Sequence, residues 1–468
     1  FNNPINGQTK FEAQTKLKNH LRIQRKYFRV IHWNLERGHR LKDLDRALNQ
    51  TTQYIKDSQD PKRDLDKELF ITEANLFKET DIYTLNEADF GMQRTDYKNT
   101  VEEFAKITKS NYYTFVPEFI EIDSKYLDHK GLDKNRIKAM HGNAIVSKFP
   151  IKYTKVIELP VCYDWFNGEQ KRVTLLEKVK RRTSRLLFDV PIFTELRRGH
   201  RNALVARIDL PDSQEDLTVI VTHFENRTRP KCRKYQLQHL LDEIKDINTP
   251  LILSGDFNNT EVSAEPTSVN SVIFRTVTDW QNLARATVSW VNPASYLTNP
   301  ILLGVNTLRK AHDPTVIGLP LFLRNKTADI FWKLINFDFS DKNMFDFSGN
   351  KELSYNGKGG KLSNSNQRIT KGFASTFRLM NHNPLTHFRL DWIFVKSLRI
   401  AGCQDREDDF EDIKPECKRF IPAFARNLSE LNDSYFRNFT NEVEDNKNRD
   451  FSLDKLSDHD PISCEILL

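Results

Sequence analysis

The sequence predicts an α/β sandwich, because short apolar strands recur along the chain and helices separate only some of them. Residues 203–210 and 217–222 are two such strands, and they flank the turn residues Pro211, Asp212 and Ser213. They predict an antiparallel pair, which a chain of alternating strands and helices would not contain. No internal repeat of fixed period is present, so a repeat architecture is not expected.

The strands are recognised by β-branched and aromatic residues, and most end at a turn or a polar residue. In chain order the predicted strands are 28–33, 81–85, 112–117, 143–147, 203–210, 217–222, 250–254, 390–395 and 461–467. The predicted helices are 64–79, 98–109 and 231–246. Residues 1–27 are polar and basic without a strong pattern, so we expect a helix or an arm there.

Composition excludes two classes of protein. The 468 residues are 38% hydrophobic and 11% aromatic, which suffices for a sizeable core and argues against a disordered chain. No run of about 18 apolar residues exists, which excludes a transmembrane helix. The chain opens with Phe1 rather than Met, so we expect that an N-terminal segment has been removed.

The positive charge of the chain is concentrated in one segment. Residues 171–201 contain ten Lys or Arg and three Asp or Glu, so this segment accounts for the whole formal excess of +7. A basic surface that faces an anion would have this character. A solvated charged loop would have it too, and charge alone leaves both interpretations open.

Five cysteines are widely spaced and show no zinc-binding pattern: Cys162, Cys232, Cys403, Cys417 and Cys464. Because five is odd, at least one thiol is free or pairs between chains. Cys403 and Cys417 could close a short loop in an oxidising compartment, whereas five reduced thiols are the alternative. Together with the missing initial Met, this pair favours a secreted or periplasmic location over a cytoplasmic one.

Polar residues of catalytic type lie at the ends of the predicted strands. Asn34, Glu87 and Asp256 follow strands, and Asp391 lies near the start of one. The segment 457–460 (Ser-Asp-His-Asp) precedes the last strand. Strand ends can direct side chains from distant parts of the chain to one place, so we expect these residues to form a site.

The residue types suit hydrolysis of a phosphate ester. Mg²⁺ binds one or two carboxylates and keeps several waters, which suits Glu87 and Asp458. The reaction also needs an oriented water, a proton acceptor and positive charge, for which Asp256, His459 and His223 are candidates. Each residue alone has an ordinary interpretation, since an Asp after a strand is usually a cap or turn residue. The ordered set carries the prediction.

Seven short motifs occur in the order typical of one protein family. They are Trp33-Asn34, Asn86-Glu87, 141–147 (HGNAIVS), Thr222-His223, 255–258 (GDFN), 389–393 (RLDWI) and 457–462 (SDHDPI). This set resembles the endonuclease/exonuclease/phosphatase superfamily, the DNase I-like metal-dependent phosphoesterases. The resemblance covers residues 28–468, which we take as the domain, with an insertion at about 285–375. It implies a four-layer α/β sandwich with two central, mostly antiparallel β-sheets.

The resemblance implies an Mg²⁺-dependent phosphodiester hydrolase, in which metal-assisted water attacks phosphorus. Asn34, Glu87 and Asp458 match positions that hold the metal or lie close to it, and Mn²⁺ or Ca²⁺ are alternatives to Mg²⁺.

The resemblance also assigns catalytic positions. Asp256 matches the aspartate that orients or deprotonates the water, and Asn258 matches the asparagine that contacts the scissile phosphate. His459 matches the histidine that stabilises or protonates the phosphoryl group, and Asp391 matches its carboxylate partner. His223 matches a second histidine of the deoxyribonuclease and sphingomyelinase branches, which abasic-site endonucleases usually lack.

Nucleic acid is the predicted substrate, with an endonuclease or a nucleic-acid phosphodiesterase as the activity. Its predicted contacts are Asn143, Arg181, Arg182, Arg185 and Arg201. Aromatic residues are sparse in the basic segment, so we expect contacts to the phosphate backbone and little sequence preference.

A second motif, His223-x-Glu225 followed by Arg233-x-x-Gln236, resembles the tyrosyl-DNA phosphodiesterase branch. Alternatively, Arg233 and Gln236 tie their helix to a neighbouring loop, because residues three apart lie on one helix face.

The insertion suggests a different substrate. Its apolar stretches 317–323 and 330–332 could form an exposed surface for peripheral contact with lipid, as in a sphingomyelinase-like phosphodiesterase. A small-molecule phosphatase of the same superfamily is the other alternative. The same stretches could instead bury a core of the insertion's own. A binding module without activity is disfavoured, because every motif residue is present.

Overall fold

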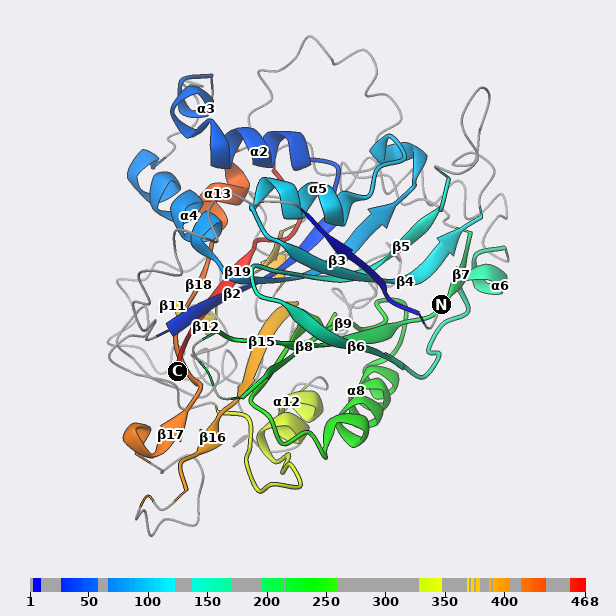
Figure 1. Ribbon diagram of the computed structural model, residues 1–468. Coiled ribbons are helices and arrows are strands. Elements are labelled where there is room, and N and C mark those ends of the chain that lie inside the picture. The colour runs from blue at the N-terminus through cyan, green and yellow to red at the C-terminus, as the bar shows by residue number, and fades with distance from the viewer. Residues whose placement is uncertain are drawn as a thin grey trace, which may run out of the picture.

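Helix, sheet, sheet and helix form four layers in the computed structural model of this protein (Figure 1). The structure describes residues 3–9, 27–57, 66–122, 137–170, 196–211, 213, 215–258, 328–346, 368–369, 372–373, 376–378, 387–388, 390–401, 403, 414–434 and 455–468. The predicted four-layer α/β sandwich with two central sheets is confirmed.

The first sheet has eight strands among the described residues, in the order β1-β4-β5-β3-β2-β19-β18, with β7 paired to β4. Most neighbours are antiparallel, and β2 and β3 are parallel. The strands are β1 (Ile5–Gln8), β2 (Tyr27–Arg37), β3 (Ile82–Phe90), β4 (Tyr112–Glu121), β5 (Met140–Ser147), β7 (Arg197–Gly199), β18 (Ile421–Asn427) and β19 (Ile462–Leu467).

The second sheet has the order β15-β10-β9-β8-β6, and only β9 and β10 are parallel. Its strands are β6 (Ile151–Glu158), β8 (Asn202–Ile208), β9 (Leu217–His223), β10 (Leu251–Asp256) and β15 (Asp391–Lys396). The predicted antiparallel pair is confirmed as β8 and β9. Three further ladders pair β11 (Arg368–Ile369) with β12 (Gly372–Phe373), β13 (Phe377–Arg378) with β14 (His387–Phe388), and β16 (Leu398–Arg399) with β17 (Lys418–Arg419).

Helices cover the outer faces of both sheets (Figure 1). Over the first sheet lie α2 (Leu41–Asn49), α3 (Thr51–Asp57), α4 (Lys67–Glu79), α5 (Thr100–Ile107) and α13 (Ser429–Asp433). Under the second sheet lie α8 (Pro230–Ile244) and α12 (Ala328–Ile335). The short elements α6 (Trp165–Gln170), η1 (Gln93–Thr95) and η6 (Pro415–Cys417) lie in connections.

Local sequence explains where the helices begin. Asn99 precedes α5 and its side chain accepts hydrogen bonds from the backbone N–H groups of Val101 and Glu102. Asp66 caps α4 in the same way through Leu69 N. Helix α8 begins with Pro230, whose fixed φ and missing N–H suit the first helical position.

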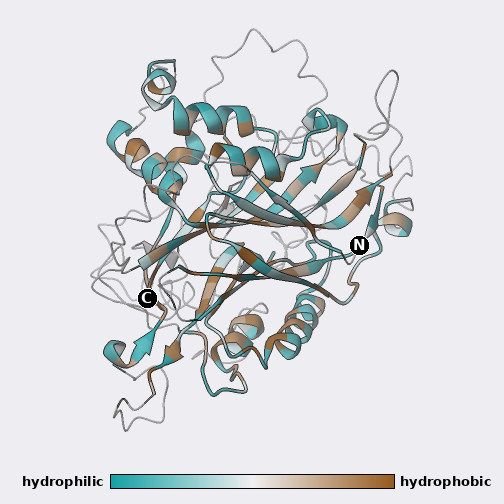
Figure 2. Ribbon diagram, viewed as in Figure 1, coloured by the Kyte–Doolittle hydropathy of each residue, from teal (hydrophilic) through white to brown (hydrophobic). Residues whose placement is uncertain are grey.

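Three apolar clusters hold the four layers together. One joins the upper helices to the first sheet, one fills the space between the sheets, and one joins the second sheet to α8 and α12. Figure 2 shows apolar residues concentrated in the sheets and hydrophilic residues on the helix faces. Because strands in such a sandwich are covered on both faces, most of their residues are buried. This packing holds the strands, and therefore their ends, in place.

The N-terminal arm and the insertion are joined to the domain where they are described. Strand β1 of the arm pairs with β4, so part of it is an edge strand rather than a helix. In the insertion, α12 packs on the second sheet, and Phe331 lies 4.5 Å from Trp392 between ring centroids. Ile330 and Phe331 are buried, as the alternative of a core had it, whereas Trp332 of the same stretch is exposed. The other stretch, 317–323, lies outside the described residues. No helix in the described part of the chain has the length and apolarity needed to cross a membrane.

Two disulfides join cysteines distant in sequence. Cys403 pairs with Cys417, as one of the two expectations had it, and Cys162 pairs with Cys232 across 70 residues. Cys464 is free and buried. The Cys162–Cys232 pair was not predicted, because no short-range sequence pattern relates the loop after β6 to the start of α8.

Candidate active site

The candidate catalytic residues meet at one edge of the two sheets. Strands β2, β3, β9 and β10 end at this edge, and β15 and β19 start there because they run antiparallel to β10 and β2. Asp256, the last residue of β10, lies opposite Asp391 on one neighbouring strand and opposite His223 on the other. The prediction that strand ends bring these residues together is therefore met by the register of the ladders.

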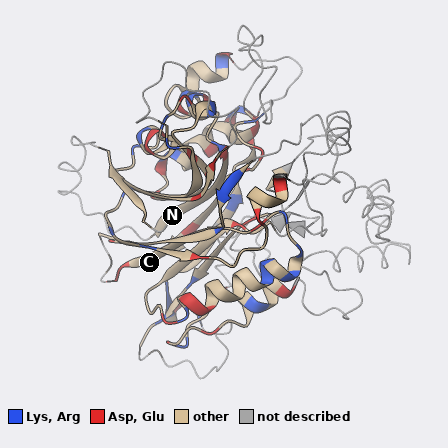
Figure 3. Ribbon diagram, turned by 90° about the vertical axis from the view of Figure 1, so that its right-hand side faces the viewer, with Lys and Arg blue, Asp and Glu red and all other residues tan. Residues whose placement is uncertain are grey.

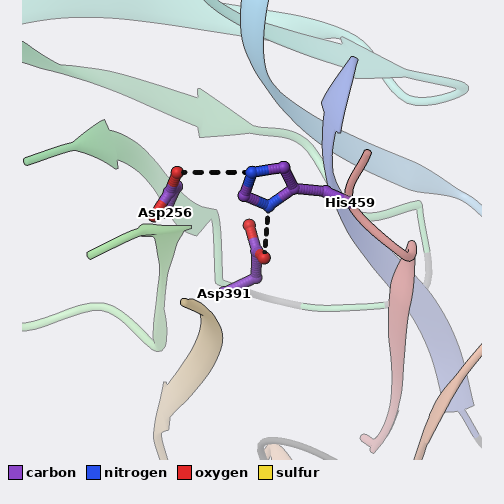
Figure 4. A group of neighbouring side chains, drawn as sticks. All are labelled: Asp256, Asp391 and His459. Carbon is purple, nitrogen blue, oxygen red and sulfur yellow. Dashed lines mark hydrogen bonds and ion pairs between the residues drawn. The ribbon is translucent and has the colours of Figure 1, made fainter. Parts of the chain in front are cut away.

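A relay of three side chains, Asp391, His459 and Asp256, lies at the centre of the site and is joined by one hydrogen bond and one longer ion-pair contact (Figure 4). Asp391 Oδ2 lies 2.7 Å from His459 Nδ1, and His459 Nε2 lies 3.8 Å from Asp256 Oδ2. All three side chains are buried. Their ligand atoms lie within 4.8 Å of one another, so this cluster also has the donor set of a metal site. However, the short Asp391–His459 bond already occupies one nitrogen and one oxygen of that set.

The charges in the relay support one another. Burial alone would lower the pKa of His459, but the carboxylates of Asp391 and Asp458 raise it well above its ordinary value. Burial would raise the pKa of Asp391, but His459 and His32 hold it below its ordinary range. Burial and the nearby Asp391 raise the pKa of Asp256. The relay therefore combines an ionised Asp391, a protonated His459 and an Asp256 of increased basicity.

His223 faces the same oxygen of Asp256 from the other side. Its Nε2 lies 3.5 Å from Asp256 Oδ2, and its Nδ1 lies 2.7 Å from Arg201 Nη1. A guanidinium only donates, so Nδ1 accepts this bond and Nε2 carries the ring proton. Arg201 in turn donates to Glu118 Oε2 at 2.8 Å. Burial would raise the pKa of Glu118, but Arg201 and His223 lower it to about 2.

Glu87 is directed into the site by a break in the strand pairing. The pairing of β3 with β5 shifts between Leu85 and Ala88, and Glu87 has a positive φ of 55°. Such bulges re-aim a side chain, and a non-glycine residue at positive φ stores backbone strain. Burial would raise the pKa of Glu87, but His141 and His223 hold it below its ordinary range. No described side chain is hydrogen-bonded to this carboxylate, which leaves its oxygens for a ligand.

Asp458 and Asn34 lie beside these groups. Burial raises the pKa of Asp458 to about 6, with Glu87 adding to the shift and His459 opposing it. Asn34 Nδ2 lies 3.4 Å from Asp256 Oδ2. A divalent cation would relieve the crowding of two carboxylates, and oxygen ligands of this kind suit Mg²⁺. The predicted metal residues Glu87 and Asp458 offer such oxygens, whereas Asn34 Oδ1 accepts from Glu36 N at 3.1 Å.

The Gly-Asp-Phe-Asn motif builds the turn at the end of β10. A Cβ on Gly255 would lie 2.0 Å from the carbonyl oxygen of Thr222, so only glycine allows β9 and β10 to approach here. Asn258 has a φ of 47°, and its backbone N–H donates to Asp256 Oδ1 at 2.8 Å. Its side chain donates to Phe224 O at 2.9 Å. The motif therefore fixes the Asp256 carboxylate through the backbone that follows it.

Asn143 is fully buried under the site. Its Oδ1 accepts from Asn86 at 2.6 Å, and its Nδ2 donates to Asn202 Oδ1 at 3.1 Å. Asn86 Oδ1 accepts from the backbone N–H of Asp256 at 2.8 Å. The structure therefore connects Asn143 to Asp256 through Asn86, whereas a contact with substrate was predicted.

The basic segment is described only at its end. Arg181, Arg182 and Arg185 lie outside the described residues. Arg201, grouped with them as a surface contact, is buried because its guanidinium is held between Glu118 and His223. Strand β7 carries two further arginines of the segment and is the short blue arrow of Figure 3.

The motif of Glu225, Arg233 and Gln236 has the structural role that the second interpretation gave it. Arg233 donates to the backbone oxygens of Glu225 and Thr228, both at 3.2 Å. Gln236 accepts from Glu225 N at 3.1 Å and donates to Pro160 O at 3.0 Å. These bonds tie α8 to two loops beside His223.

Three residues of the site were missed from the sequence. Glu118 and His32 lie inside strands, where a single polar residue gives little local signal. His32 could have been found, because it precedes Asn34 by two residues and thus shares its face of β2. Asn432 holds the loop of His459 through Ser457 O and His459 O, both at 3.0 Å, and sequence gave no sign of it.

Several solved structures align with this chain over most of its length. Among solved structures, an endonuclease/exonuclease/phosphatase family protein from Bacteroides thetaiotaomicron aligns with 13% identity and a TM-score of 0.40, over 94% of this chain and 98% of that one. The human Nocturnin catalytic domain aligns with 14% identity and a TM-score of 0.38, over 95% of each chain. A mannosyl-6-phosphatase from Bacteroides thetaiotaomicron aligns with 12% identity and a TM-score of 0.38, over 94% of this chain and all 100% of that one.

No curated relative matches the sequence. A sequence profile of the Endonuclease/Exonuclease/phosphatase family matches residues 31–459, which is most of the chain and includes the residues of the relay. The chain therefore belongs to the endonuclease/exonuclease/phosphatase family, whose members are hydrolytic phosphoesterases and generally depend on a metal.

Proposed function

We propose that this protein is an Mg²⁺-dependent phosphodiester hydrolase that acts on nucleic acid. The observation that carries the proposal is the position of Asp256 between two histidines, 3.5 Å from His223 Nε2 and 3.8 Å from His459 Nε2. Beside it, Glu87 offers a carboxylate without a described hydrogen-bond partner. A proton acceptor, a cationic donor and an oxygen ligand for a metal thus lie together, as hydrolysis of a phosphate ester requires.

Asp256 and His459 have complementary roles in this mechanism. The raised pKa of Asp256 makes its carboxylate a better acceptor for the proton of the attacking water. The raised pKa of His459 keeps its ring charged, so that Nε2 can donate to a phosphoryl oxygen as negative charge develops there. Asp391 maintains that charge and the ring orientation.

Glu87 and Asp458, with Asn34, would hold the divalent cation. When bound, it would act as a Lewis acid on a phosphoryl oxygen. The side chains of this chain would still perform the proton transfer, because neither His459 Nε2 nor Asp256 is needed as a metal ligand in this arrangement.

Positive charge next to the site supports nucleic acid as the substrate. Arg198 is exposed on β7 and stacks on Phe166 at 4.7 Å, and the rest of the basic segment precedes it in sequence. Arg181, Arg182 and Arg185 would then contact the phosphate backbone, and their loss would flatten the dependence of binding on salt. The burial of Ile330 and Phe331 gives less support to a lipid substrate.

A substrate panel tests the activity. Plasmid DNA, RNA, sphingomyelin vesicles and a phosphate monoester are incubated with the protein, with Mg²⁺ or with EDTA, and Asp256→Asn is the matched inactive control. We expect Mg²⁺-dependent cleavage of DNA or RNA by wild type only. Turnover of sphingomyelin or the monoester alone would contradict the nucleic-acid substrate. No turnover with Mg²⁺, Mn²⁺ or Ca²⁺ would contradict the hydrolase itself.

We also propose that the protein is secreted or periplasmic. Two disulfides support this, since structural disulfides persist in oxidising compartments. Thiol labelling of the denatured, unreduced protein from its native source should find one reactive cysteine, Cys464. Labelling of all five cysteines would contradict the proposal.

A further inference from the structure

Asp391 has a second histidine partner that the mechanism above does not use. His32 lies on β2 and is fully buried, and its Nε2 lies 3.2 Å from Asp391 Oδ1. His459 takes the other oxygen of the same carboxylate at 2.7 Å. We propose that His32 is a positioning residue, which fixes the Asp391 carboxylate and through it the ring of His459. The inference rests on the proposed hydrolysis, in which His459 acts.

The hydrogen-bond partners of His32 set its tautomer. An ionised carboxylate only accepts, so His32 Nε2 carries a proton and donates it to Asp391. The other ring nitrogen, Nδ1, lies 3.2 Å from the Thr84 hydroxyl. Ser254 Oγ in turn donates to Thr84 Oγ1 at 2.8 Å. Ser254, Thr84, His32 and Asp391 thus form one hydrogen-bonded chain. The Thr84 and Ser254 hydroxyls are also anchored to the backbone, 3.3 Å from Ile31 O and 3.2 Å from Ile220 O.

This chain crosses the interface between the two sheets. His32 and Thr84 are paired residues of β2 and β3 in the first sheet, whereas Ser254 and Asp391 belong to the second. The surrounding layer is aliphatic and includes Val30, Ile82, Val221, Ile252 and Ile393.

Packing alone would not require polar side chains in that layer. An aliphatic residue at position 32 would fill the space with no buried polar group to satisfy. Among the described residues, Asp391 is the charged group that this chain of hydrogen bonds reaches. We therefore assign the function of His32 to Asp391, whose Oδ1 it contacts while His459 contacts Oδ2.

Two fixed oxygens hold a carboxylate better than one. With His32 present, Asp391 cannot turn about its Cβ–Cγ bond without breaking a bond at each oxygen. Without it, Oδ1 would lose this donor, and rotation of the group would move Oδ2 away from His459 Nδ1. Residues that orient a catalytic group in this way typically change activity about 10- to 100-fold when removed.

The test compares His32→Leu, which removes the donor, with His32→Gln, whose amide N–H can reach Asp391 from a similar position. His239→Gln, a histidine of α8 outside the site, is the control. Two quantities are measured: kcat and KM for the substrate found in the panel, and the imidazole N–H resonances of the protein labelled with ¹⁵N-histidine. His459→Gln assigns the resonance of His459.

We expect His32→Leu to lower kcat about 10- to 100-fold with KM changed less than about twofold, and to shift or broaden the His459 resonance. His32→Gln should recover most of kcat and the resonance. Equal losses in both variants, or a wild-type kcat in folded His32→Leu, would overturn the inference. If His32→Leu does not fold, Thr84→Val, which removes the hydroxyl that orients His32, is judged by the same two measurements.

The resonance separates this inference from the proposed function. If the wild type hydrolyses no substrate, the proposed function fails, and the His459 resonance still reports whether His32 positions the pair. An unchanged resonance in both His32→Leu and Thr84→Val would overturn the positioning role, whatever the activity.

Discussion

The two histidines beside Asp256 have similar positions but differ in the group that contacts their Nδ1 atom. Both direct Nε2 to the same carboxylate oxygen, at 3.5 Å from His223 and 3.8 Å from His459. Behind His459, Nδ1 faces the Asp391 carboxylate at 2.7 Å. Behind His223, Nδ1 faces the Arg201 guanidinium at 2.7 Å, and the Glu118 carboxylate lies 3.5 Å from the same nitrogen. His459 is therefore backed by a carboxylate, whereas the group nearest to His223 is a guanidinium that is itself paired with a carboxylate.

This difference shows how one residue type can serve two purposes in a single site. A carboxylate behind His459 favours the protonated ring, which can neutralise charge or release a proton. A guanidinium behind His223 donates to Nδ1, so that ring directs its Nε2 proton at the Asp256 carboxylate. We therefore infer that His459 supplies charge and His223 supplies orientation of Asp256.

The largest expected effect is a difference between two alanine variants. His459→Ala should lower kcat by about 10²- to 10³-fold, because it removes a charge-stabilising donor. His223→Ala should lower it roughly tenfold, as expected for one hydrogen bond of about 1 to 1.5 kcal/mol. Single-turnover kinetics at saturating substrate measures both. Equal losses would contradict the division of roles between the two rings.

The next prediction concerns the Glu118–Arg201 pair behind His223. Glu118→Gln leaves Glu225, 3.6 Å away, as the one carboxylate among the described residues that is paired with the buried Arg201, so we expect the free energy of unfolding to fall by about 3 kcal/mol. Urea denaturation measures the change. Glu102→Gln removes an exposed partner of Lys106 and should cost less than about 0.5 kcal/mol. Similar costs for the two variants would mean that the Glu118–Arg201 pair behaves as a surface pair.

The two rings also differ in how the backbone holds them. His223 lies in β9, where the ladders with β8 and β10 fix it, whereas His459 lies in a loop before β19. Asn432 holds that loop, since its Nδ2 donates to three oxygens, including Asp460 Oδ1 at 2.8 Å. Asn432→Asp keeps the shape and removes the donors.

We expect Asn432→Asp to lower the free energy of unfolding by about 1 to 3 kcal/mol, because buried acceptors lose their donor. Its kcat should fall with KM nearly unchanged, since the loop carries His459. Asn248→Asp at an exposed position after α8 is the control and should leave both quantities near wild type. If kcat of folded Asn432→Asp stayed at the wild-type value, Asn432 would only stabilise the fold.

The residues around His459 could be predicted from the sequence better than the residues around His223. Asp256, Asp391 and His459 lie at strand ends in recognisable motifs. The role of Arg201 depends on Glu118, which is 83 residues earlier and inside a strand. Counting charge cannot distinguish a guanidinium that contacts a buried carboxylate from one that faces substrate.

The same limit explains the other errors. Strands and long helices were predictable because their periodicity is local. The pairing of β1 with β4, the Cys162–Cys232 disulfide and the contact of His32 with Asp391 depend on the register between distant strands. That register is set by packing across the sheets and has no short-range signal.

The smallest expected effect is a slope in the dependence of stability on pH. The pKa of His459 in the folded protein lies well above its ordinary value of 6.5, so the folded state keeps a proton that the unfolded state releases. Its contribution to stability is therefore fully present below about pH 6.5 and is lost as pH rises through the pKa of the folded state. One proton gives a slope of at most about 1.4 kcal/mol per pH unit.

Asp391→Asn should remove this slope, because it removes the charge that contributes most to the raised pKa of His459. His223→Asn should keep it, because this change leaves the Asp391–His459 pair intact. The free energy of unfolding is measured from pH 6 upward in the three proteins, and the slopes are compared. Equal slopes in wild type and Asp391→Asn would mean that Asp391 does not hold the proton on His459, and the electrostatic difference between the two rings would then lose its basis.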